Sequence, residues 1–205
     1  MVPVLDNGYV ALLWYNDEDV ISRITSICYA KEREQEDVVA VFRRMESLYV
    51  RGDLSPFEFI SMRFYLKAPI FVLRQIFRHR TAKIMEMSRR YVDDEKVPFE
   101  FYTPEGANLT DYYTSATNEY RRLLAAGFRK EQARVVLPVS LYSECFWQID
   151  ARNFINFLQQ RAGPHAQMET REYALAMVTE LEIRMSALYR LLGEHVLPKK
   201  EEEKK

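Results

Sequence analysis

The sequence predicts a mixed α/β (α+β) fold with strands early in the chain and helices late. Apolar and polar residues alternate at 60–66 of the 205-residue chain, whereas apolar residues recur at helical spacing through most of the second half. No repeat and no long linker divides the chain, and its 48% apolar content is ample for a core. We therefore expect one domain over residues 1–197 and a charged tail at 198–205, without apolar residues, that is disordered.

The first half is expected to mix strands and helices, each justified by its local pattern. Alternation predicts the strand at 60–66, apolar residues three and four apart predict the helices, and a proline at the first helical turn has no helical N–H to lose. The expected elements are a strand at 8–15, a helix at 17–30, a helix at 35–49 ended by Gly52, a strand at 60–66, a helix from Pro69 towards Arg80, and a strand at 97–102.

The second half is expected to be mostly helical. Glycines and prolines mark the ends of the apolar runs, as they do at helix termini. The expected helices are 109–126 ended by Gly127, 130–137, 143–161 and 165–193, with Gly163 and Pro164 between the last two.

Composition narrows the function classes. A formal net charge of -1 and a pI near 6.4 argue against a general nucleic-acid-binding protein, which needs a broad basic surface. No stretch has the apolar length of a membrane span, and the N-terminus lacks the features of a secretory signal, so we expect a cytoplasmic protein. Cys28 and Cys145 form no CxxC pair and are expected to be ordinary small residues. His79, His165 and His195 are far apart, so we expect no metal.

Positive charge gathers in one segment. From Arg74 to Arg90 there are six Arg or Lys residues and one carboxylate, Glu86. Arginines on a helix are often only a solvated face. Here, however, the cluster follows the apolar run Ile70–Leu73, which favours a helix that carries its basic end to a defined place. Paired guanidinium N–H groups match phosphate oxygens, so the segment predicts an anion site.

A second unusual pattern lies further along the chain. Arg152, Asn156 and Gln160 are spaced four apart among large apolar residues, so they form one polar stripe on the predicted helix. Two interpretations stay open from the pattern alone. The stripe is either the wet side of an amphipathic helix or the lining of a ligand cavity, and Arg161 and His165 follow it directly.

These segments together resemble a known family. Arg78, His79 and Arg80, followed after seven residues by Ser88, resemble the signature of the flavin-dependent thymidylate synthases. Further blocks resemble the same family in the same order, namely KAPIFVLRQIF before the signature, SPFEF at 55–59, EFY at 100–102, ARVVLP at 133–138 and FWQIDARNFINFLQQRAGPHAQ at 146–167. The resemblance covers most of the chain.

The resemblance implies an FAD enzyme with an early antiparallel sheet, usually a homotetramer with active sites shared between subunits. Such an enzyme methylates C5 of the uracil in dUMP, with methylenetetrahydrofolate as carbon donor and NADPH as reductant, while the protein binds and orients the reactants. A paralogue that methylates UMP, or both UMP and dUMP, is the alternative. A flavin- or nucleotide-binding paralogue without catalysis is a further one.

The resemblance also implies roles for individual residues. The nucleotide contacts are Gln75, Arg78, Glu86, Ser88, Arg90, Arg134 and Arg161, with Arg89 as an added cation beside the phosphate. The flavin contacts are Cys28, Ser55, Glu58, Arg78, His79, Arg80, Asp150, Arg152, Asn156 and His165. Arg161 is the expected catalytic residue, because it can stabilise negative charge on the ring carbonyls. Ser88 is expected to bind phosphate, since no base is fixed beside it to make it a nucleophile.

Six positions near the expected site depart from the family pattern. They are Asp53 and Phe59, where the family often has histidine, and Met85, Arg89, Asp150 and Gln160. A carboxylate or a phenyl ring cannot replace imidazole as a hydrogen-bond donor, so folate or NADPH contacts are in question. These changes motivate the UMP alternative, because one additional polar partner can admit one additional hydroxyl.

Overall fold

A five-stranded antiparallel sheet is the centre of the computed structural model, which describes residues 1–27, 30 and 35–199. The strand order is β1-β2-β3-β5-β4. The strands are β1 (Val2–Val4), β2 (Gly8–Tyr15), β3 (Ser61–Pro69), β4 (Lys83–Glu86) and β5 (Tyr142–Asp150). Each neighbouring pair is antiparallel. The mixed α/β class and the single antiparallel sheet are confirmed.

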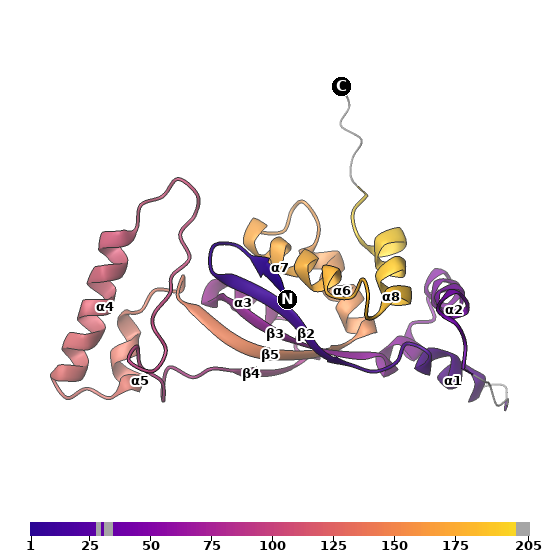
Figure 1. Cartoon of the computed structure of the whole chain (residues 1–205), viewed down its shortest axis with the longest axis horizontal. Helices are drawn as coiled ribbons and strands as arrows, with labels where there is room; N and C mark the ends of the chain where they lie inside the picture. Colours follow the sequence, from indigo (N-terminus) through magenta and orange to yellow (C-terminus); the bar gives the residue numbers. More distant parts are fainter. Residues whose placement is uncertain (28–29, 31–34, 200–205) are drawn as a thin grey trace, which may run out of the picture.

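The helices surround this sheet unevenly. Their bounds are α1 (Val20–Ile27), α2 (Val38–Val50), α3 (Ile70–Ile76), α4 (Thr110–Ala125), α5 (Lys130–Ala133), α6 (Ala151–Arg161), α7 (Met168–Thr179) and α8 (Ser186–Leu191), with 3₁₀ turns η1 (Ser55–Phe59) and η2 (Arg134–Val136) and a π-helical turn η3 (Leu192–Val196). Figure 1 shows α6, α7 and α8 over one face of the sheet, α4 and α5 at one end of the molecule, and α1 and α2 at the other.

Strand β5 corrects the largest wrong prediction, a helix over 143–161. Cys145, Trp147 and Ile149 are buried beneath the helices, whereas Phe146 between them is 43% exposed on the other face. This period of two is that of a strand. A short run with apolar residues on both faces cannot be told from a buried helix by its pattern. The helix proper, α6, begins only after Asp150.

Other boundaries were also predicted wrongly. Strand β4 was not expected, and all four of its residues are exposed. The expected strand at 97–102 makes only an isolated bridge, between Phe101 and Leu141. The helix after Pro69 ends at Ile76, well before Arg80. The expected long helix at 165–193 is divided into α7, α8 and the π-helical turn.

Several predictions are confirmed within a few residues. The strands at 8–15 and 60–66 are β2 and β3, and the helices at 35–49 and 109–126 are α2 and α4. Gly52 and Gly127 follow these two helices with φ of 75° and 89°, a backbone region that glycine enters without strain. Most of the predicted tail, residues 200–205, lies outside the described residues.

None of the described helices covers the second face of the sheet (Figure 1). The rings of Tyr9, Tyr65 and Phe146 contact one another there. Trp14 and Met85 are also exposed, the latter 72%. We call this surface the bare face. Among the described helices, none combines the length and the apolar character needed to cross a membrane.

Candidate active site

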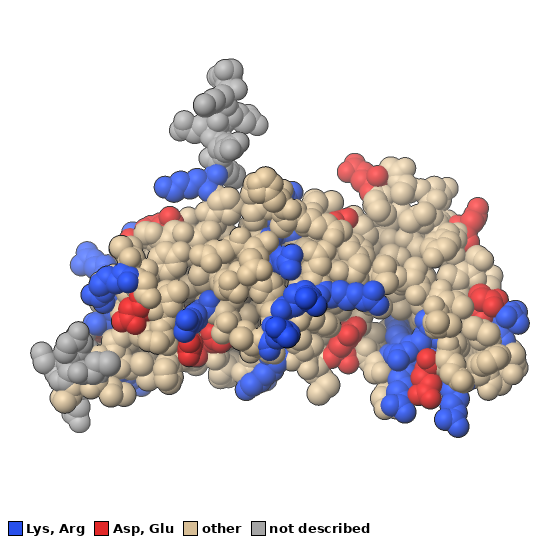
Figure 2. Space-filling view, turned by 180° about the vertical axis from the view of Figure 1, so that it is seen from behind, with Lys and Arg blue, Asp and Glu red and all other residues tan. Residues whose placement is uncertain are grey.

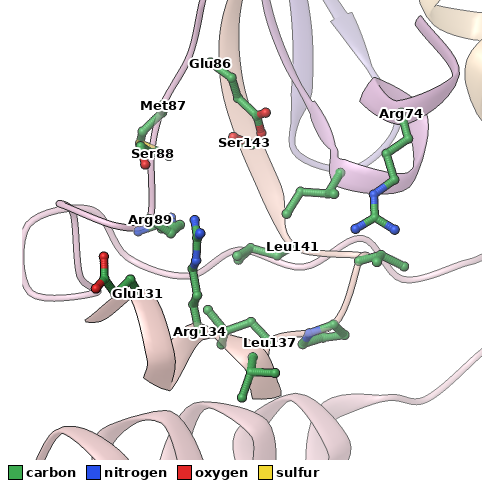
Figure 3. Close-up of a pocket in the computed structure, with 14 residues that line it drawn as sticks. Arg74, Glu86, Met87, Ser88, Arg89, Glu131, Arg134, Leu137, Leu141 and Ser143 are labelled. Atoms are coloured by element: carbon green, nitrogen blue, oxygen red, sulfur yellow. The ribbon is translucent and has the colours of Figure 1, made fainter. Parts of the chain in front are cut away.

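A cavity of about 560 Å³ opens at the sheet edge, between β4, the start of β5, α3 and the α5–η2 segment (Figure 3). Its wall includes three guanidinium groups, on Arg74, Arg89 and Arg134, and the hydroxyl of Ser88. Glu86 and Glu131 supply the carboxylates. The full lining is Ile70, Arg74, Glu86, Met87, Ser88, Arg89, Glu131, Arg134, Val135, Leu137, Pro138, Val139, Leu141 and Ser143. Three cations and a hydroxyl around one hollow are suited to an oxyanion.

Strand β4 brings the signature serine to this cavity. Glu86 pairs with Cys145, and the N–H of Met87 donates to the Glu144 carbonyl at 2.8 Å. The chain then turns, with the Tyr91 N–H donating to the Ser88 carbonyl at 3.0 Å and the Arg90 N–H donating to Ser88 Oγ at 3.2 Å. The hydroxyl is thus fixed where the strand ends, and no imidazole lies in this wall to activate it.

Arg89 stabilises the wall of the cavity and also adds a positive charge to it. It is 6% exposed, and its NH1 donates to the Val97 carbonyl at 2.8 Å and to the Asp93 carbonyl at 3.2 Å. Its guanidinium lies 4.8 Å from the centroid of Phe99, and burial lowers its pKa. Neutral carbonyls do not cancel its charge. Arg89 therefore holds the 93–98 loop while contributing positive potential beside the cavity.

The other arginines of the cluster have different surroundings. Arg90 forms an ion pair with Glu131, Nε to Oε2 at 2.6 Å, and does not line the cavity. Arg74 and Arg134 line it, and neither side chain forms an ion pair or hydrogen bond within the described part of the chain. Both guanidinium groups are therefore free to meet a ligand. Arg74 was counted in the basic segment but was not predicted to be a site residue.

A second group of predicted residues lies around the end of α6. His79 is 7% exposed, and its ring meets Phe157 edge-on at 4.9 Å between centroids. Burial, and secondarily the charge of Arg161, lowers the His79 pKa, so the imidazole is neutral at pH 7. His79 Nε2 and Arg161 Nε are both buried and have no partner among the described residues. Such orphaned polar atoms are typical of a ligand site.

Gln75 contacts the residue that precedes α7. Its Nε2 donates to Oε1 of Gln167, the residue that precedes α7. Arg78 and Arg80 are exposed, and neither side chain has an ion-pair partner in the described ranges. Figure 2 shows the face opposite to that of Figure 1, where a band of Lys and Arg side chains crosses the middle of the molecule. His165 is exposed in the turn between α6 and α7.

A third group of predicted residues lies around η1 and along α6 from its start. Asp150 caps α6, since its carboxylate accepts from Asn153 N at 2.9 Å and from Asn153 Nδ2 at 2.7 Å. Its charge is therefore engaged with the helix terminus. The remaining contacts of this group are Arg152 with Glu58, Gln160 Nε2 donating to Asn156 Oδ1 at 3.0 Å, and Ser55 Oγ donating to Asp53 Oδ1 at 3.3 Å. Cys28 lies outside the described residues.

Within one chain, the cavity and the third group lie apart, whereas the second group adjoins the cavity through α3, where Gln75 follows Arg74. The cavity is at the Ser143 end of β5, and the stripe of α6 begins at its Asp150 end. Seven steps of about 3.3 Å along a strand place these ends roughly 23 Å apart. Of the residues predicted to bind the nucleotide, Glu86, Ser88, Arg89 and Arg134 line the cavity, whereas Gln75 and Arg161 are not in its wall.

Sequence reasoning missed three residues that the fold places at these groups. Arg74 and Ser143 line the cavity, and Gln167 holds Gln75. A signal existed for Arg74, because it lies four residues before Arg78 on the same predicted helix. For Ser143 no sequence signal existed, because only its position in β5 buries its side chain in the wall of the cavity. Two departures from the family pattern lie on exposed surface, Phe59 at 53% and Met85 at 72%.

The fold also brings His195 near two carboxylates. Glu46, Glu194 and His195 each offer a ligand atom, all within 4.8 Å of one another. His195 Nε2 already lies 3.0 Å from Glu46 Oε1, and Glu194 accepts from Arg190 Nε at 2.7 Å. These side chains thus serve one another as polar partners, and they belong to α2, α8 and η3, away from the cavity.

Comparison with known proteins identifies the family of the chain. The family described as "Thymidylate synthase complementing protein" matches residues 11–185. The flavin-dependent thymidylate synthase of Thermotoga neapolitana is 38% identical over 190 residues, which are 86% of each chain. That of Thermus thermophilus is 34% identical over 221 aligned residues, 96% of this chain and 79% of the relative. The chain belongs to the flavin-dependent thymidylate synthase family.

Solved structures extend the likeness of this flavin-dependent thymidylate synthase family member. A UMP/dUMP methylase, PolB from Streptomyces cacaoi, bound with 5-Br dUMP, superposes with a TM-score of 0.78 at 27% identity, covering 93% of this chain and 96% of that one. The same methylase bound with 5-Br UMP gives a TM-score of 0.75 at 26% identity. The predicted family and its methyltransferase type of enzyme are confirmed, as is a flavin as the family's cofactor.

Proposed function

We propose that the protein reductively methylates C5 of the uracil in dUMP, with FAD as its flavin, methylenetetrahydrofolate as carbon donor and NADPH as reductant. The cavity at the end of β4 is the observation that carries this proposal. It combines free guanidinium groups with the signature serine and one strand carboxylate, which is the donor and acceptor set that a nucleoside monophosphate needs. We propose the cytoplasm as its compartment.

The phosphate is expected at the cationic part of the cavity. Arg74 and Arg134 can each present two N–H groups to phosphate oxygens, and Ser88 Oγ can donate a further bond. Arg89 adds potential from its buried position. Arg90 is held by Glu131 in this structure, and it can contact the phosphate only by exchanging that partner.

Arg161 is the proposed activator of the pyrimidine. Its partly buried guanidinium is adjacent to neutral His79, so its charge is not shared with a second cation there. A fixed positive charge near the ring carbonyls stabilises the negative charge that develops when C5 becomes nucleophilic. His79 can then donate or accept one hydrogen bond at the unpartnered Nε2 without adding charge.

The residues predicted to hold the flavin suit a polar heterocycle with phosphates. Buried atoms without partners lie at His79 and Arg161, and Arg152, Asn156 and Gln160 line one side of α6 with their side chains exposed. When bound, the flavin would supply the hydride chemistry of the reaction. The protein groups would orient it: Arg152, paired to Glu58 here, offers a cation for the phosphates, and Asn156 offers an amide for the ring or the adenine.

We also propose that the protein works as a homotetramer with shared active sites. The cavity and the start of the α6 stripe, at Arg152, lie at opposite ends of β5, roughly 23 Å apart, which is a long reach for one reaction centre within a single chain. Residues from two chains would remove this difficulty. The bare face supports self-association, because it exposes aromatic and apolar side chains, including Trp14 and Phe146, beyond what a monomer needs.

UMP is the second candidate substrate. One specific observation favours it: the similar solved structure is that of a UMP/dUMP methylase, bound in separate crystals to 5-Br dUMP and 5-Br UMP. The cavity also has polar groups beyond those that a phosphate can use, since Glu86 cannot donate to an anion.

One assay tests both substrates. The holo-protein is incubated with methylenetetrahydrofolate labelled in the transferred carbon, NADPH, and either dUMP or UMP, and the nucleotide products are separated. Label in the dUMP product supports the first proposal, and label in the UMP product supports the second. No labelled nucleotide from either, with flavin bound and reduced by NADPH, would refute the proposed reaction.

Shared sites are tested by mixing two inactive variants. Arg161→Ala removes the proposed activator and Arg134→Ala removes a phosphate donor, so each homo-oligomer should be nearly inactive. Subunits exchanged between the two should regain activity, because a site built from two different chains can combine the intact half of each. Recovery no better than the sum of the separate variants would show that each chain carries its own complete site.

A further inference from the structure

Ser143 is a buried hydroxyl without a partner in the wall of the cavity. It is 3% exposed, and its Oγ has no hydrogen bond to any described residue. It lies near the start of β5, on the side of the strand that carries Cys145, Trp147 and Ile149 into the core. An apolar residue would suit that row. A hydroxyl buried there is unfavourable unless something completes its hydrogen bonding.

The strand register places Ser143 beside two polar side chains, Glu86 at the end of β4 and Ser88 two residues after it. Glu86 lies opposite Cys145, and the Met87 N–H donates to the Glu144 carbonyl at 2.8 Å. One further step in this register brings Ser88 opposite Ser143. Residues opposite each other in an antiparallel pair point to the same face, so Glu86, Ser88 and Ser143 share one wall. In Figure 3 the Glu86 carboxylate points towards Ser143.

The chemistry of this wall differs from that of the cationic part of the cavity. A carboxylate accepts hydrogen bonds and repels phosphate, so the ligand group that meets Glu86 must be a donor. A serine hydroxyl both donates and accepts. The parts of a nucleoside monophosphate next to its phosphate that donate are the sugar hydroxyls. A sugar hydroxyl is therefore the group that fits beside Glu86 and Ser143.

We propose that Ser143 hydrogen-bonds a sugar hydroxyl of the bound nucleotide and is a specificity residue of this enzyme. The inference rests on the proposed nucleotide site, with the phosphate held by Arg74, Arg134 and Ser88. Ser143 takes part in no bond making or breaking. It reads the sugar, either at the 2′-hydroxyl that only UMP has or at the 3′-hydroxyl that both nucleotides have.

The test uses the holo-protein and its Ser143→Ala variant. Dissociation constants for UMP and dUMP are measured by calorimetry, and inorganic phosphate is measured as a competitor of the nucleotide. In the proposed site, phosphate binds Arg74, Arg134 and Ser88 without contacting Ser143, so it reports whether the cavity itself is intact. Ser140→Ala is the matched control, because this half-buried serine precedes β5 by two residues and does not line the cavity.

We expect Ser143→Ala to weaken nucleotide binding about tenfold, which corresponds to roughly 1.4 kcal/mol, with inorganic phosphate and Ser140→Ala unchanged. A loss confined to UMP assigns the 2′-hydroxyl, and an equal loss for both nucleotides assigns the 3′-hydroxyl. The inference is overturned if Ser143→Ala binds both nucleotides as wild type does, or if phosphate weakens in parallel. A wild-type protein that binds neither nucleotide would instead refute the proposed function itself.

Discussion

Replacing Arg134 with Gln tests the phosphate end of the cavity. The Arg134 guanidinium points into the cavity and has no ion pair or side-chain hydrogen bond in the residues described (Figure 3). A bound phosphate would therefore meet a group that has no protein partner to give up. Hydrogen bonds to charged groups stabilise by about 1.5–3 kcal/mol, and the exposure of Arg134 favours the low end, about 1.5–2 kcal/mol. The dissociation constant for dUMP should rise about ten- to thirtyfold.

The assay is calorimetric titration of the holo-protein with dUMP at two salt concentrations. Wild-type affinity should fall more steeply with salt than that of Arg134→Gln, because the variant has lost one screened charge interaction. Arg129→Gln is the control: this arginine precedes α5, its side chain is 83% exposed, and it does not line the cavity. A change below twofold for Arg134→Gln, or an equal loss in Arg129→Gln, would refute the placement of the phosphate.

Three further predictions concern stability, each measured by urea unfolding of the variant beside wild type. Trp147→Ala should cost about 3–5 kcal/mol, whereas Phe146→Ala on the bare face should cost about 1 kcal/mol or less; equal losses would contradict the strand assignment. Burial raises the pKa of Glu18 to about 7 from 4.5, so its contribution to stability, complete below pH 4.5, is lost as pH rises towards 7. Glu18→Gln should therefore flatten that decline, and parallel pH profiles would count against it. Gly8→Ala should lower the free energy of unfolding by about 1–3 kcal/mol, because a Cβ there would lie 1.8 Å from the Tyr173 hydroxyl. Removing that hydroxyl with Tyr173→Phe should recover part of the loss. No recovery would show that the clash is instead with the carbonyl oxygens of Lys67 and Val4.

How much of the fold was predictable depended on whether a segment has one buried face. Strand β3 alternates cleanly, and α2 repeats its apolar residues on one side, so both were found. Strand β4 has four exposed residues and no such pattern, because only its pairing with β5 makes it a strand. Strand β5 was mistaken for helix since Phe146, on its uncovered side, is as apolar as the residues that it alternates with.

Glu86, Ser88 and Arg134 were named from the sequence and line the cavity, but which of the predicted residues lie together was not predictable. The signature identified His79, yet only the end of α3 at Ile76 explains why this imidazole turns inward against Phe157 while its two neighbouring arginines stay exposed. Likewise, Arg89 was expected as an added cation beside the phosphate, and the fold also uses its N–H groups on the carbonyls of the 93–98 loop. Such assignments depend on distances across the chain, which spacing along the sequence does not contain.

One wall of the cavity is formed by a short edge strand of the sheet. Strand β4 is outermost in the strand order, is four residues long, and within the described chain is tied to β5 alone. Short edge elements of this kind open at lower free-energy cost than central strands. The width of the cavity can therefore adjust to a slightly larger sugar without disturbing the core. We expect ligand binding to slow amide hydrogen exchange in β4 more than in β3.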